Sequence, residues 1–153
     1  MKHSLILLII VLLFTGCSSS DKSTPSYTKT TVNYSIKGVL HGSEVEVGIR
    51  NKSLYLKAIH PMSGINKSRQ YTLTNSEIKS VYDFLKENNF NEIKSPAKSM
   101  LTDVPIVILT VSYDKYKNTI DLTAAEEIPP AVVNLSELLM TLAQKYDSTW
   151  QGE

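Results

Sequence analysis

Few residues of the chain have side chains suited to catalysis or metal binding. Cys17 is the only cysteine, and His41 and His60 are the only histidines after residue 16. Neither histidine has a second His or Cys at the spacing that zinc sites use, and each lies beside a predicted turn. The sequence contains no nucleophile elbow, Gly-rich phosphate loop, zinc-protease helix or CxxC pair. We therefore predict no catalytic residue, no metal site and no cofactor.

The first seventeen residues have the pattern of an export signal. A basic start at Lys2 precedes an apolar run over 5–14, and two small residues stand directly before Cys17. This order is typical of secretory signal peptides. The apolar run is too short to cross a bilayer as a helix, which takes about 20 residues. We predict that 1–16 is a signal peptide and is removed.

Thr15-Gly16-Cys17 resembles the lipobox of bacterial lipoproteins. In that family the cysteine becomes the first residue of the mature chain and carries a diacylglyceryl thioether and usually an amide-linked acyl chain such as palmitate. The resemblance implies that Cys17 is the lipidation site and that several acyl chains give a stable membrane anchor. It places the protein in the bacterial cell envelope. The alternative is an unmodified cysteine that ends an ordinary signal peptide.

The residues after Cys17 bear on which membrane holds the anchor. Positions 18 and 19 are both serine, and the lack of Asp there resembles outer-membrane sorting in enteric bacteria. This implies an outer-membrane protein facing the periplasm if the host is Gram-negative.

Length and charge restrict the domain organisation and the partners. The 153 residues include 16 basic and 15 acidic side chains. Without the signal peptide, the length fits one domain and a tether. The balanced charge argues against nucleic acid as a partner, because phosphate binding needs a basic patch. With Cys17 lipidated, no thiol remains for a disulfide, so burial alone must stabilise the domain.

The stretch after the lipidation site is polar up to residue 31. It contains a single aromatic residue and no hydrophobic periodicity, so it cannot bury enough apolar surface to fold. We predict a lipidated cysteine and flexible tether over 17–31 and one folded domain over 32–153.

Alternating and β-branched apolar residues predict the strands of this domain. A hairpin is expected where two alternating runs flank the segment from Gly38 to Gly42. A continuous apolar run over 105–113 predicts a central strand buried on both sides. The predicted strands lie at 32–36, 45–49, 53–59, 69–73, 105–113 and 119–122, with a loop-like stretch over 62–67.

Two helices are predicted. Thr74 and Glu77 form a capping box, which marks a helix start. Asn88-Asn89 marks its end, because Asn tolerates the left-handed conformation found at helix ends. The second helix begins at Pro129-Pro130 and continues to residue 146 with apolar residues at helical spacing. Together these elements predict an α+β fold, in which an antiparallel sheet of about five to six strands has two helices packed on one face.

The folded region resembles emfourin, a protein inhibitor of the thermolysin-like metalloprotease protealysin. The resemblance covers about 32–146 and rests on the following residues: Gly38, Gly42, Leu73-Thr74, Glu77, Phe90, Asp103, Leu109-Thr110-Val111, Thr119-Ile120, Ala124-Ala125, Ile128-Pro129, Leu135, Leu138 and Leu142. It implies an α+β domain whose protein partner is a thermolysin-like metalloprotease.

We expect a membrane-anchored lipoprotein with a small non-enzymatic protein-binding domain that inhibits a metalloprotease. The candidate contact is the hairpin tip Val39-Leu40-His41, because exposed apolar residues on a loop suit partner binding. The alternative for Val39 and Leu40 is packing within the sheet. Two other functions stay open, an envelope structural or assembly lipoprotein without inhibitory activity and an enzyme of an unrecognised type.

Overall fold

The computed structural model describes residues 25–38 and 42–150. Six strands form one sheet in the order β4-β3-β2-β1-β5-β6, and every neighbouring pair is antiparallel. The strands are β1 (Thr31–Lys37), β2 (Glu44–Arg50), β3 (Ser53–His60), β4 (Ile65–Thr72), β5 (Ile106–Tyr113) and β6 (Tyr116–Asp121). The helices are α2 (Asn75–Glu87) and α3 (Pro130–Tyr146), with short 3-10 helices η1 (Ser26–Lys29) and η2 (Pro61–Ser63).

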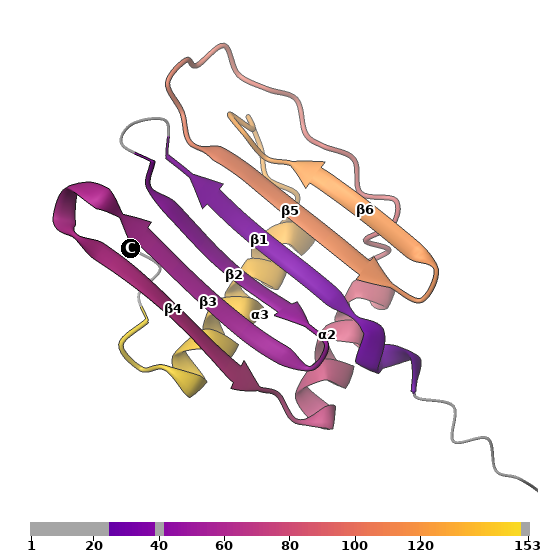
Figure 1. Ribbon diagram of the computed structural model, residues 1–153. Coiled ribbons are helices and arrows are strands. Elements are labelled where there is room, and N and C mark those ends of the chain that lie inside the picture. The colour runs from indigo at the N-terminus through magenta and orange to yellow at the C-terminus, as the bar shows by residue number, and fades with distance from the viewer. Residues whose placement is uncertain (1–24, 39–41, 151–153) are drawn as a thin grey trace, which may run out of the picture.

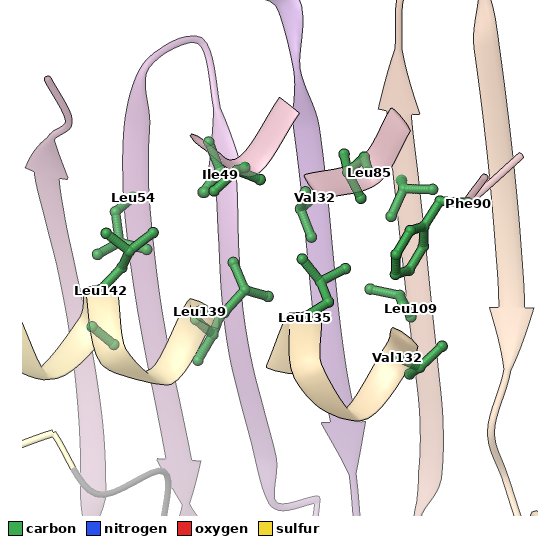
Figure 2. Packing of buried hydrophobic residues seen from close by; sticks show 14 of the residues in the cluster. Val32, Ile49, Leu54, Leu85, Phe90, Leu109, Val132, Leu135, Leu139 and Leu142 are labelled. Carbon is green, nitrogen blue, oxygen red and sulfur yellow. The ribbon is translucent and has the colours of Figure 1, made fainter. Parts of the chain in front are cut away.

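Both helices cover the same face of the sheet (Figure 1). Alternate residues of the strands point toward them, so Val32, Ile49 and Leu109 are almost fully buried. The apolar stripe of α3, with Leu135 and Leu139, packs above these strand residues (Figure 2). The predicted α+β fold is therefore confirmed, with six antiparallel strands and two helices on one face.

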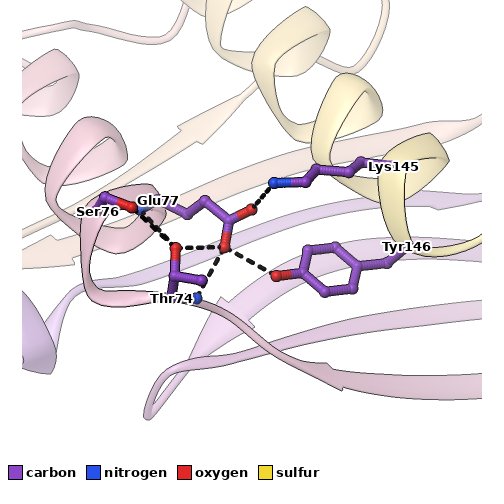
Figure 3. A network of polar contacts seen from close by, with 5 residues as sticks. All are labelled: Thr74, Ser76, Glu77, Lys145 and Tyr146. Carbon is purple, nitrogen blue, oxygen red and sulfur yellow. Dashed lines mark hydrogen bonds and ion pairs between the residues drawn. The ribbon is translucent and has the colours of Figure 1, made fainter.

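The N-terminus of α2 is tied to the C-terminal end of α3 through Glu77 (Figure 3). The predicted capping box is present, since the Thr74 amide donates to Glu77 Oε2 at 2.7 Å and the Glu77 amide donates to Thr74 Oγ1 at 3.3 Å. From α3, Lys145 Nζ lies 2.5 Å from Glu77 Oε1, and the Tyr146 hydroxyl donates to Oε2 at 2.8 Å. One carboxylate thus caps one helix and anchors the other.

These contacts control the ionisation of Glu77. Burial by itself would raise the pKa of its carboxyl group, whose side chain is only 11% exposed. The hydrogen bonds from Lys145, Thr74 and Tyr146 favour the charged form and outweigh burial, so the pKa of Glu77 is lowered to about 2.

The strand β5 differs from its prediction. The run over 105–113 is not buried on both sides, because burial alternates along the strand and Ile106 is 50% exposed. The reason is that helices cover only one face of the sheet. β5 is nevertheless an interior strand, paired with β1 on one side and β6 on the other.

The strand β4 is longer than predicted. It covers Ile65–Thr72, whereas the sequence predicted a strand over 69–73 and a loop over 62–67. Gly64, with a φ of 70°, ends η2 in the left-handed conformation and lets the chain return at once alongside β3. The polar side chains of this edge strand leave no apolar alternation to recognise.

The folded part also begins earlier than predicted. Residues 26–29 form η1, Thr28 and Thr30 are buried, and β1 starts at Thr31. Tyr27 packs against the core and explains why this polar stretch can fold. The predicted tether over 17–31 is therefore wrong in its last residues. The predicted signal peptide over 1–16 and the rest of the tether lie outside the described residues.

Neither helix among the described residues combines the length and the apolar character needed to cross a membrane.

Candidate partner-binding end of the sheet

Three connections meet at one end of the sheet. They are the β1–β2 connection, the β3–β4 connection through η2, and the segment that leads into β5 (Figure 1). The strand register fixes this arrangement, because Lys37 at the end of β1 is opposite both Glu44 and Ile106, the first residues of β2 and β5. We call this the loop end of the sheet.

Large apolar side chains at the loop end are exposed to solvent. Met62 in η2 is 77% exposed, and Leu101 and Ile106 on the segment into β5 are 66% and 50% exposed. Met100 next to Leu101 is fully exposed. Along the order of the strands, Met62 lies on the β3 side of the β1–β2 connection. Met100, Leu101 and Ile106 lie on its β5 side. Solvated apolar side chains that gather on loops mark surfaces for partners.

The sequence-predicted contact Val39-Leu40-His41 lies outside the described residues. The residues that flank it are described. Gly42 has a φ of 67°, a conformation that favours glycine, and the Gly38 amide donates to the Ser43 carbonyl at 2.8 Å. Because β1 and β2 lie between β3 and β5, Gly38 and Gly42 lie between the two groups of exposed apolar residues.

A charged cluster lies next to the loop end on the face of the sheet that the helices leave open. Glu44 Oε2 lies 2.6 Å from Lys57 Nζ, and Glu44 Oε1 lies 3.5 Å from Lys37 Nζ. The hydrogen bond from Lys57 is the main cause of the lowered pKa of Glu44, and Lys37 adds to it. This cluster places charged side chains beside one part of the loop end, on the open face of the sheet.

The open face also carries a shallow depression of about 300 Å³ lined by Glu46, Arg50, Ser53, Tyr55 and Gln70. Tyr55 lies across Gly48, where a Cβ atom would come within 2.2 Å of the Tyr55 hydroxyl oxygen. Burial, with a smaller effect of the Glu46 carboxylate, raises the pKa of Tyr55 to about 12. The Tyr55 hydroxyl oxygen is itself buried and has no hydrogen-bond partner among the described residues.

Of the histidines and the cysteine, whose side chains are suited to catalysis or metal binding, only His60 lies among the described residues. His60 ends β3 and is half-buried, and His41 lies outside the described residues. In the described ranges, no three His, Cys, Asp or Glu side chains lie close enough together to hold a metal ion. Cys17, the predicted lipidation site, is not among the described residues.

The exposed methionines and leucine were not predicted from the sequence. Met62 and Met100 lie in stretches without periodicity, and only their places after β3 and before β5 bring them to one end. The signal available in the sequence was a pair of adjacent apolar residues, Met100-Leu101, in an otherwise polar loop.

Comparison of the sequence with protein-family models and with curated proteins gives no match.

Proposed function

We propose that this chain is a lipid-anchored binding protein of the bacterial cell envelope, whose domain binds and inhibits a thermolysin-like metalloprotease and is not an enzyme. The observation that carries the proposal is the loop end, where Met62, Met100 and Leu101 are exposed on two connections. The lipobox-like Thr15-Gly16-Cys17 supports the anchor, and the resemblance to emfourin supports the choice of partner.

The place where the chain enters the domain agrees with this role. The described residues begin at η1, and β1 then runs from Thr31 toward Lys37 at the loop end. The chain from the proposed anchor therefore joins the sheet at the end opposite to the exposed apolar loops (Figure 1). A partner at the loop end binds on the side of the domain remote from the attachment point.

The anchor is tested by fractionation. We expect the wild-type protein to sediment with membranes and to incorporate labelled palmitate, whereas Cys17→Ser leaves no thiol for the thioether and moves the protein to the soluble fraction. Ser18→Ala is the matched control and should behave as wild type. Equal membrane binding by Cys17→Ser, without label in either protein, would contradict lipidation.

The binding surface is tested with variants of the loop end. Replacing Met62 and Leu101 together by serine removes two exposed apolar contacts, which should weaken inhibition of a thermolysin-like protease by about tenfold or more. The change should leave the thermal midpoint of unfolding nearly unaltered, because neither side chain is in the core. The residual peptide cleavage is measured after a slow pre-incubation with the full chain in detergent.

A control variant tests whether inhibition depends on where the exposed apolar side chain lies or only on how much apolar surface is exposed. Tyr116, 41% exposed, lies at the β5–β6 turn, at the opposite end of the sheet from Met62 and Leu101. Tyr116→Ser should inhibit as the wild type does. If it weakens inhibition as much as the loop-end variant, the loop end is not the contact.

An envelope assembly lipoprotein without inhibitory activity is the second candidate. The same exposed apolar loops favour it, since they suit a permanent partner equally well. Cross-linking in intact envelopes separates the two functions: a peptidase as the major cross-linked protein supports inhibition, and a stable envelope component supports assembly.

A further inference from the structure

The two edges of the sheet differ in how they are covered. Along β6, the Asn118 side chain donates to the carbonyls of Phe90 and Ile93 at 2.7 and 2.8 Å, and the Asp121 amide donates to Ser95 Oγ at 2.9 Å. The segment after α2 thus shields that edge (Figure 1). At the other edge, the five residues 66–70 of β4 are all exposed. Within the described part of the chain, no strand pairs with the outer side of β4.

The tight β2–β3 turn determines which backbone groups of β4 face outward. Asn51 and Lys52 have φ values of 49° and 64°, as a two-residue type I′ hairpin requires. Arg50 and Ser53, which close this turn, are therefore a hydrogen-bonded pair, and such pairs alternate with non-hydrogen-bonded ones along the ladder. On β3, every second residue from Leu54 then directs its backbone groups toward β4.

The same alternation continues into β4. The register pairs Leu56 with Arg69 and Ala58 with Lys67, so Lys67 and Arg69 use their backbone groups on β3. The N–H and C=O groups of Asn66, Ser68 and Gln70 consequently face outward, where an additional strand could bind them.

The side chains of this edge are cationic on one side. Lys67 and Arg69 share the helix side of the sheet, and both are exposed. Neither forms an ion pair in the described ranges. Arg69 lies near enough to Asp147 to contribute to its lowered pKa, although the hydrogen bond from Thr149 is the main cause of that shift.

We propose that β4 accepts an extended acidic segment of a protein partner as a seventh, antiparallel strand. The added strand would hydrogen-bond to Asn66, Ser68 and Gln70, a mode of binding in which the backbone supplies affinity. Its acidic side chains, two residues apart, would lie opposite Lys67 and Arg69. Those are non-hydrogen-bonded positions, where facing side chains approach most closely. This inference rests on the proposed function and adds the class of segment that is bound.

A second copy of the chain does not fit this edge. An antiparallel pairing of two β4 strands centred on Ser68 places Lys67 of one copy opposite Arg69 of the other. If residue 66 of one copy pairs with residue 68 of the other, Lys67 lies opposite Lys67. If residue 68 pairs with residue 70, Arg69 lies opposite Arg69. Like charges directly opposite each other destabilise a sheet, so these residues oppose self-association and favour an acidic strand.

The test uses the full chain in detergent micelles and two capped peptides that alternate threonine with either glutamate or lysine. We expect the glutamate peptide to bind about tenfold more tightly than the lysine peptide, since two cross-strand charge pairs change from attractive to repulsive. We also expect it to slow amide hydrogen exchange over 65–72. Equal binding of both peptides, no binding of either, or protection confined to another segment would overturn the inference.

Two variants make the test specific. Ser68→Pro removes an outward-facing N–H without removing a hydrogen bond to β3, and should abolish the protection, whereas Ser68→Ala keeps the N–H and should retain it. Reversing both charges with Lys67→Glu and Arg69→Glu should invert the preference toward the lysine peptide. That gain of binding cannot result from misfolding, and its failure to occur would overturn the inference.

Failure of the inference can be told apart from failure of the proposed function. Inhibition of the protease by a chain that does not bind the glutamate peptide at β4 overturns the inference and leaves the inhibitor function in place. Binding of the glutamate peptide at β4 by a chain that inhibits no thermolysin-like protease supports the inference and overturns the inhibitor function.

Discussion

A Phe90→Ala variant is expected to lose about 3–5 kcal/mol of the free energy of unfolding, the usual cost of truncating a buried phenylalanine. Phe90 lies three residues after the last residue of α2 and is fully buried (Figure 2). Its ring centroid lies 6.0 Å from that of Phe84. The cavity left by the ring would lie under the end of α2 and beside β5 and β6. Small domains have a total stability of about 5–15 kcal/mol, so the variant should be close to unfolding.

Urea denaturation followed by circular dichroism measures this loss, and Phe90→Leu is the matched control. Leucine keeps most of the apolar volume, so its cost should stay below about 1.5 kcal/mol. A loss below 1 kcal/mol for alanine, by the same order-of-magnitude reasoning, would mean that Phe90 is not central to the core.

Stability should fall as the pH is lowered, in part through Glu77 and in part through Asp121, whose pKa the hydrogen bonds from Lys98 and Thr123 also lower to about 2. The pKa of Glu77 is about 2 in the folded chain, against an ordinary value of 4.5, so its stabilising contribution is present above about pH 4.5. That contribution is lost as the pH falls from about 4.5 to about 2, because the unfolded chain then binds the proton more readily than the folded chain does. The difference between 4.5 and about 2 corresponds to about 3 kcal/mol.

Glu77→Gln should remove the part of this pH dependence that Glu77 causes. Glutamine can still accept the hydrogen bond of the capping box but carries no charge for Lys145. We expect the variant to be about 1–3 kcal/mol less stable than wild type at pH 7 and nearly equal to it only near pH 2. Asp83→Asn, which breaks the exposed ion pair with Lys79 in the same helix, should cost less than about 0.5 kcal/mol. Parallel stability curves for wild type and Glu77→Gln would contradict this role of Glu77.

The elements that the sequence predicts well are those that local chemistry defines. The capping box at Thr74 and the left-handed Asn89 give both ends of α2, and Pro129-Pro130 gives the start of α3. These signals involve residues close in sequence, so they do not depend on how the rest of the chain packs.

The features that were mispredicted depend on distant residues. The apolar composition of β5 suggested burial on both sides, but which faces are covered depends on where the helices pack. The polar strand β4 forms because β3 offers it a free edge, and no apolar pattern reveals this. The residues around Tyr27 fold because the core provides a place for one aromatic ring.

The candidate site could be predicted only in part. The sequence indicates a hairpin next to Val39-Leu40-His41, and the structure confirms the flanking strands β1 and β2. The sequence could not indicate that Met62 and Met100 come to the same end of the sheet, because this follows from the order of the strands. The outward-facing backbone of β4 likewise follows from the register alone.

The inhibitor function is tested most directly by titrating a thermolysin-like protease with the full chain in detergent and measuring the remaining peptide cleavage. We expect a dose-dependent loss of activity that reaches completion near one inhibitor chain per protease. Undiminished cleavage at micromolar concentrations of the chain, with circular dichroism showing a folded domain, would contradict the inhibitor function.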